Sequence, residues 1–253
     1  DDASVGGGEF NLALGGESVV GGGSGNQATG SQSVVGGGFG NTASGKGAVV
    51  AGGGTKFGGS ADPYYSYNNI ASGDYSSILG GRTDTATGQY SVVSGGFLQN
   101  AVGAYSAIAG GYALRLGTFS FGYNTDSTSA HSPVTDLTAF DHIAYFGGTD
   151  MWLGNVNGQA KQLRFYAPNT SRSYSGAKFS SFNATSQTTD INYTLPAALP
   201  VAGAFLKASS VSGSNVMLVW DTVTGGGGRG PAWLLTGNSG TTAGLNYIGT
   251  NAV

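Results

Sequence analysis

The side chains that could carry out catalysis stand far apart in this 253-residue sequence. Glu9 and Glu17 are its only glutamates, and most aspartates lie singly beside glycine, serine or threonine. Cleavage of a glycosidic bond usually needs two carboxyl groups several ångströms apart, one of them with a raised pKa. Asp136 and Asp141 are the best pair for this, but they are five positions apart in an expected loop. We therefore expect no enzymatic activity.

Metal and nucleotide sites have no stronger support. The only histidines are His131 and His142. One histidine from each of three copies of the chain would make a metal or anion site. No HxH or HExxH spacing accompanies them, which favours solvated loop residues. The stretch 40–46 imitates a phosphate-binding loop ending in Lys46, but Gly47 stands where that motif needs serine or threonine. Cysteine is absent. The sequence predicts no cofactor and no metal.

Aromatic residues form the candidate ligand-binding site, as a platform for a glycan. They are Tyr64, Tyr65, Tyr67, Tyr75, Tyr90, Tyr105 and Phe119. The first three lie in an irregular stretch, whereas the last four recur at intervals of 15, 15 and 14 residues. We expect those four to stack along one edge of the fold. Such a column is either a ladder that stabilises the fold or a platform for sugar rings, and both roles are compatible if the rings are half exposed.

The aromatic column belongs to a repeat that sets the fold. Its core reads Ala-[Ser/Thr]-Gly-x-x-Ser-x-aliphatic, with a Gly-Gly pair close behind. The repeat glycines are Gly15, Gly30, Gly45, Gly73, Gly88, Gly103 and Gly117. Their one long interval, 28 residues, suggests two coils of 14 with Gly59 between them, although residues 54–68 lose the pattern and would also suit a protruding loop. A unit this short is one coil of a solenoid, stabilised by its neighbours.

The phase of the repeat predicts which side chains point inward. Serine three residues after the repeat glycine and an aliphatic residue five after it share one strand face, which we place inside, with the alanine two before it. The Gly-Gly pairs suit a bend. Position four is also largely apolar and must point outward, as at Val19, Val34 and Val49. This second apolar stripe predicts association with copies of the chain, and a trimer fits best.

Turns such as the one at residues 26–37 resemble the head repeats of YadA-like trimeric autotransporter adhesins. The resemblance covers residues 5–123 and implies a left-handed parallel β-roll, with three rolls packed into one head. Arg115 replaces the small alanine of the last turn and suggests the end of the roll. Residues 150–253 resemble the distal shaft of trimeric phage tail fibres, through phrases at 192–196, 203–207 and 218–220.

Four segments follow from these patterns. They are a repeat β-roll at 1–123, transition loops at 124–148, a β-rich shaft at 149–224, and a glycine hinge with a distal β segment at 225–253. The expected fold class is all-β throughout, because no segment has a convincing helical period.

Charge and hydropathy limit the partners. The formal net charge is −3 and the ten basic residues are scattered, so nucleic acid is not expected as a partner. No apolar run approaches the roughly 18 residues of a membrane span, so we expect no membrane insertion by this segment.

The resemblances and the repeat together predict a homotrimeric fibre that binds a cell-surface polysaccharide or protein receptor. We expect it on the tail fibre of a phage virion or an injection system. The alternatives are the head of a bacterial autotransporter-type surface adhesin, which would be extracellular at the cell surface, and a purely structural filament subunit.

Overall fold

The computed structural model describes residues 2–55, 68–125, 134–153, 162–167, 178–183 and 188–222. These residues form strands and turns without a helix, which confirms the all-β fold class. The chain divides into two compact units, Asp1–Trp152 and Leu153–Val253.

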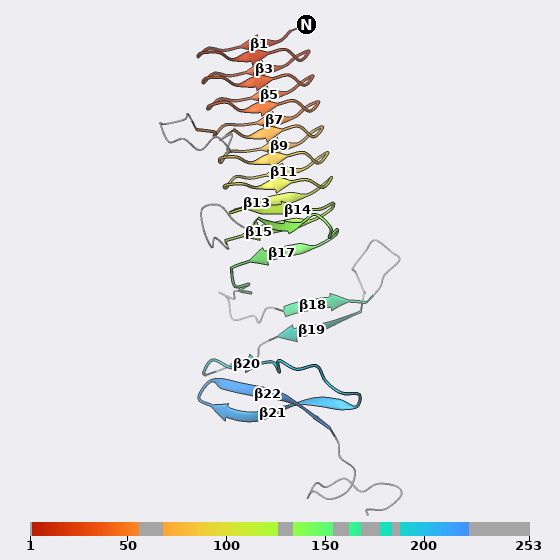
Figure 1. Ribbon diagram of the computed structural model, residues 1–253. Helices are drawn as coiled ribbons and strands as arrows, with labels where there is room; N and C mark the ends of the chain where they lie inside the picture. Colours follow the sequence, from red (N-terminus) through yellow and green to blue (C-terminus); the bar gives the residue numbers. More distant parts are fainter. Residues whose placement is uncertain are drawn as a thin grey trace, which may run out of the picture. The chain divides into compact units, whose positions relative to one another are not determined.

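The first unit is a stack of coils in which two parallel sheets face each other (Figure 1). One sheet contains β1 (Ser4–Val5), β3 (Val19–Val20), β5 (Val34–Val35), β7 (Val49–Val50), β9 (Ser77–Ile78), β11 (Val92–Val93), β13 (Ala107–Gly111), β15 (Phe121–Asn124) and β17 (Ala144–Gly147), in that order. The other contains β2 (Leu12–Ala13), β4 (Gln27–Ala28), β6 (Thr42–Ala43), β8 (Ile70–Ala71), β10 (Thr85–Ala86), β12 (Asn100–Ala101), β14 (Leu114–Leu116) and β16 (Thr135–Leu137). This confirms a parallel β-solenoid.

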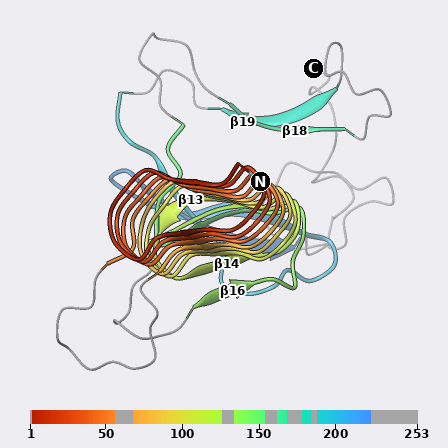
Figure 2. The same ribbon diagram turned by 90° about the horizontal axis from the view of Figure 1, so that it is seen from above.

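Each coil repeats the register of the one before it. Val19 pairs with Val34, and Val34 with Val49, so every ordinary step along the sheet is 15 residues. Seen along the stack, successive coils superimpose as flattened loops (Figure 2). The strands are only two residues long in most coils, so their order comes from stacking on neighbours rather than from strand length.

The long interval of the repeat holds one coil, not two. β6 pairs directly with β8, and β7 with β9, across the 28-residue step. The interpretation of Gly59 as the centre of an additional coil is therefore wrong. The step from Asn41 to Asn69 is 28 residues, against 15 from Asn26 to Asn41, so this coil carries 13 extra residues at one bend.

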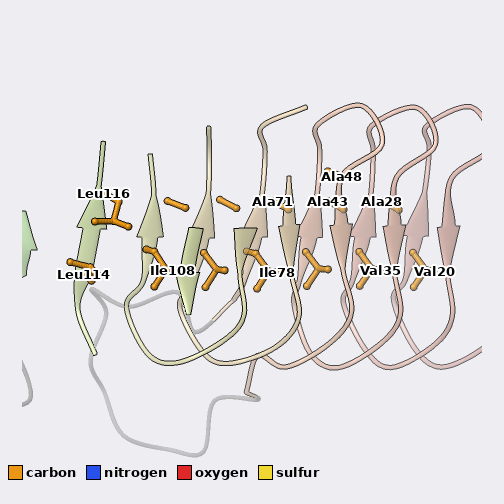
Figure 3. Close-up of a cluster of buried hydrophobic side chains, with 14 residues drawn as sticks. Val20, Ala28, Val35, Ala43, Ala48, Ala71, Ile78, Ile108, Leu114 and Leu116 are labelled. Carbon is orange, nitrogen blue, oxygen red and sulfur yellow. The ribbon is translucent and has the colours of Figure 1, made fainter. Parts of the chain in front are cut away.

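The interior is built from the columns that the repeat predicts. The aliphatic and alanine positions face each other in two rows, shown in Figure 3 by Val35 and Ile78 opposite Ala43 and Ala71. The serines three residues after the repeat glycine are also buried: Ser18, Ser33, Ser76, Ser91, Ser106 and Ser120. A small residue in one row opposite a branched residue in the other fills a narrow two-sheet interior without voids.

Glycine is required where coils touch at the bends. Gly38, the second residue of a Gly-Gly pair, has φ of 89°, and an added Cβ would collide with the Gly53 carbonyl of the next coil. The predicted bend and close approach are both present there.

The solenoid continues beyond residue 123, where the sequence placed its end. β14 pairs with β16 and β15 with β17, so residues 134–147 add another coil. Arg115 lies in β14 with its guanidinium paired to Asp136 in this last coil. Arginine is accepted at that position because its side chain points outward, while Leu114 and Leu116 point into the core.

The second unit contains two small sheets. β18 (Gln162–Tyr166) pairs antiparallel with β19 (Phe179–Asn183). β20 (Asn192–Thr194), β22 (Asn215–Thr222) and β21 (Ala204–Ser212) form a three-stranded sheet in the order β20-β22-β21. Most side chains of these strands are exposed, large apolar ones included. The predicted glycine hinge and distal segment, 225–253, lie outside the described residues.

Candidate functional site

The predicted aromatic column exists and is continuous. The ring centroids of Tyr75 and Tyr90 lie 5.3 Å apart, and those of Tyr90 and Tyr105 5.0 Å apart. Phe119 stacks on Tyr105 at 5.0 Å with an interplanar angle of 3°. His142 then stacks on Phe119, also at 5.0 Å, and adds a ring that sequence reasoning placed in a solvated loop. These five rings are called the aromatic ladder below.

A tight turn at the start of each coil positions every ring. In the coil of Tyr90, the Ser91 N–H donates to the Gly88 carbonyl at 3.2 Å, and Tyr90 itself has φ of 59°. A positive φ at the third turn residue is the type II geometry that usually selects glycine. The Tyr90 N–H also donates to the carbonyl of Asp74 in the preceding coil, at 2.9 Å. Turn and inter-coil hydrogen bond together fix the spacing of the rings.

The ladder residues occupy a backbone region that is costly for their type. Each ring residue has a φ between 53° and 59°, and the left-handed region costs an L-residue about 1–2 kcal/mol. A stacked aromatic pair contributes about 0.5–1.5 kcal/mol beyond its buried area. Most rings have two ring neighbours, so stacking offsets the backbone cost.

The ladder exposes ring edges rather than ring faces. The four tyrosine and phenylalanine side chains are between 42% and 51% exposed. Because near-parallel rings at about 5 Å cover each other's faces, a ligand beside the ladder meets edges and the tyrosine hydroxyls. Sugar rings prefer to stack on an open aromatic face. The arrangement therefore suits an extended ligand lying along the column better than a single sugar clamped between rings.

The other three predicted site residues, Tyr64, Tyr65 and Tyr67, lie outside the described residues. Their insertion leaves and re-enters the solenoid at the bend between β7 and β8, where Asn68 lies against Gly40. The aromatic ladder is at the opposite bend, between the alanine and aliphatic strands of successive coils. The structure therefore does not bring the ends of this insertion to the ladder.

The carboxylates considered for catalysis have structural partners. Asp136 accepts hydrogen bonds from the Thr138 hydroxyl at 2.7 Å and from the Arg115 guanidinium at 2.9 Å. The Thr138 hydrogen bonds are the larger cause that lowers the pKa of Asp136, and Arg115 adds to them. Asp141 accepts the Thr118 N–H at 2.8 Å, joining the last two coils. Within the described ranges no group of three or more metal-ligating His, Cys, Asp or Glu side chains is found.

A buried amide column runs parallel to the ladder, and sequence reasoning missed it. Its members stand four residues before each repeat glycine: Asn11, Asn26, Asn41, Asn69, Asp84 and Gln99. Each side-chain oxygen accepts the backbone N–H of the next member, as Asn26 Oδ1 does from Asn41 at 3.0 Å. The fixed spacing was visible in the repeat, but asparagine there also fitted an ordinary turn residue.

The second unit offers an open apolar groove of about 750 Å³. It lies between the loop 195–201 and β22, with Leu199, Met217 and Trp220 among its lining residues. The Trp220 indole N–H donates to the Ala198 carbonyl at 2.7 Å, which holds the loop over the strand. The groove is shallow and its walls are largely aliphatic.

Comparison with known proteins gives no family for this chain: no family model matches it, and neither does any curated protein. In the part of the chain that the structure describes, no helix is long and apolar enough to cross a membrane.

Proposed function

We propose that this chain is the receptor-binding part of a homotrimeric fibre on a phage tail or an injection system. Its solenoid is then a left-handed β-roll, and its second unit a segment of the fibre shaft. The fibre is non-enzymatic and recognises a polysaccharide or protein on a cell surface.

The observation that carries this proposal is the continuous stack of coils from β1 to β17. Such a stack makes a stiff rod whose side chains are displayed at a fixed spacing, which suits presentation of a surface. The aromatic ladder adds a half-exposed column to one edge of this rod.

Association of three copies is supported by apolar surface that one chain leaves partly uncovered. Outward-pointing Val19, Val34, Val49 and Val92 form a half-buried column on one sheet. In the second unit Tyr193, Leu199 and Phe182 are each more than 60% exposed. Small sheets without a covered face are marginal on their own, so copies of the chain are the simplest cover.

Attachment of the purified protein to target cells tests the binding role. We expect binding that is lost either in Tyr90→Ala, if the ladder contacts the receptor, or on deletion of residues 55–67, if the inserted tyrosines do. Both variants should keep the oligomeric state of the parent. Release of oligosaccharides from cell-surface polysaccharide would overturn the non-enzymatic role, and attachment unchanged in both variants would overturn both sites.

Two alternatives give different outcomes. The head of an autotransporter-type adhesin would be found on the bacterial envelope by immunogold labelling, not on virions or injection particles. A structural filament subunit would polymerise from purified protein without a ligand, and would bind no cell.

A further inference from the structure

One member of the buried amide column is an aspartate. Asp84 takes the place that asparagine holds in the coils before it, and its side chain is fully buried. Its Oδ1 behaves as the asparagine oxygens do, because it accepts the Gln99 N–H at 2.9 Å. The Asp84 N–H in turn donates to Asn69 Oδ1 at 3.0 Å. The column therefore passes through Asp84 without a break on its oxygen side.

The nitrogen side of the column shows what Asp84 replaces. In the ordinary coils the asparagine Nδ2 donates to two glycine carbonyls. Asn41 donates to Gly37 and Gly53, both at 2.9 Å, four residues before it and twelve after it. Each asparagine thus ties its own bend to the next one with an amide that has only hydrogens to offer.

In the Asp84 coil, the carbonyls at the same offsets belong to Gly80 and Gly96. An added Cβ on Gly81 would meet Asp84 Oδ2 and the Gly96 carbonyl oxygen. In the preceding coil an added Cβ on Gly53 would meet Asn69 Nδ2 and a carbonyl oxygen in the same way. Asp84 Oδ2 therefore occupies the amide position. It is buried and has no hydrogen-bond partner among the residues described.

We propose that Asp84 is protonated in the folded protein and acts as an acid-strengthened lock between coils of the roll. A carboxylate oxygen beside carbonyl oxygens has only acceptors facing acceptors, whereas a carboxylic acid O–H donates as the amide does. Protonation restores the hydrogen bond that the aspartate would otherwise remove. Loss of the proton leaves a charge inside the roll at this coil.

The surroundings of Asp84 favour the neutral form. Burial raises the pKa of Asp84 to about 7, and the Gln99 N–H opposes this only in part. Across residues 68–112 the other charged side chains are Asp74 and Arg82, both exposed at outer bends. The Arg82 guanidinium lies over the Phe97 ring, 4.3 Å from its centroid. The tyrosines of these coils are Tyr75, Tyr90, Tyr105 and Tyr112, none of them buried. No charged side chain is among the causes of the shift.

Stability then depends on pH in one window. Below about pH 4 the carboxyl holds its proton in both the folded and the unfolded chain, and the lock is fully present. Between about pH 4 and pH 7 the unfolded chain loses the proton first, so stability falls as the pH rises. Above that window it levels off. The folding equilibrium constant falls about a thousandfold across the window, the equivalent of about three pH units.

Asp84→Asn in the full chain tests the lock. Thermal unfolding followed by circular dichroism from about pH 4 to pH 8 should show the parent losing stability with rising pH. The variant should lack that loss and be the more stable protein at pH 8. Asp74→Asn makes the same change at an exposed bend and should keep the parent's slope. Parallel curves for parent and Asp84→Asn would overturn the proposal.

A second measurement does not depend on unfolding. Infrared difference spectra of the folded parent should show a protonated carboxyl band near neutral pH that is missing in Asp84→Asn. Its absence in the parent at about pH 5 would show an ionised Asp84, and the lock would be refuted.

Discussion

At the scale of single residues, the aromatic ladder sets two opposing local terms against each other. Tyr105 has φ of 58° and stacks on both Tyr90 and Phe119. Glycine is the usual residue in that backbone region, and the coil just before the ladder does use Gly47, with φ of 62°. The Tyr75 ring leans over Gly47, where an added Cβ would come within 2.8 Å of it. The ladder thus starts where a glycine leaves room for the first ring.

Two substitutions at Tyr105 separate stacking from backbone strain. Tyr105→Ala loses both stacked neighbours but keeps the left-handed backbone, and should lower the free energy of unfolding by about 1–3 kcal/mol. Tyr105→Gly loses the same contacts but removes a strain of about 1 kcal/mol, so it should be the more stable of the two variants. Chemical denaturation of both proteins gives the order. An alanine variant as stable as the glycine variant would show that the turn is unstrained.

Residue identities were predictable where a column has one chemical requirement. Val35 and Ala43 are buried as the repeat phase required, and Tyr90 lies in a stacked column. His142 was not predictable, because a longer coil separates it from Phe119 and hides the period. Asp84 was not predictable as a buried acid, since its role depends on asparagines in other coils that the sequence also suits to turns.

At the scale of the coil, the repeat glycines decide how closely coils approach. An added Cβ on Gly30 would strike the Gly45 carbonyl and come within 2.8 Å of the Ser44 carbonyl oxygen, both backbone atoms. Gly22 lies in the bend of the same coil stack, and an added Cβ there meets no atom within 4 Å. Neither glycine has a positive φ, so the two differ in space alone.

Gly30→Ala should therefore destabilise the protein by at least about 2 kcal/mol, because the coils must move apart. Gly22→Ala should be neutral or slightly stabilising, by up to about 1 kcal/mol, because it only restricts the unfolded chain. Thermal unfolding of the two variants makes the comparison. Equal stability would mean that the coils separate at little cost.

The long coil shows the limit of a periodic argument. A 28-residue step is divisible by two, and this arithmetic favoured an additional coil around Gly59. The pairing of β6 with β8 shows an insertion instead. Periodicity counts residues along the chain, whereas hydrogen bonds between coils count only those in the strands, so an insertion at a bend leaves the register unchanged.

At the scale of the whole molecule, the proposed trimer depends on the outer face of one sheet. Val49→Asp places a charge in its half-buried apolar column, and should shift the protein from trimer to monomer in sedimentation experiments. Thr42→Asp puts the same charge on the other sheet, also at a half-buried position, and should leave the trimer intact. A parent protein that sediments as a monomer, or a trimeric Val49→Asp, would contradict this interface.

The direction of the hydrogen bonds between coils has a mechanical consequence. Bonds such as Val34 N–H to Ala48 carbonyl connect one coil to the next, and successive coils share them along the stack. A pull on the two ends of a single roll loads the outermost set of bonds first, so coils detach one after another. Each freed coil of 15 residues yields about 50 Å of slack chain. An attached fibre would in this way lengthen in steps under flow and dissipate work before the attachment itself is strained.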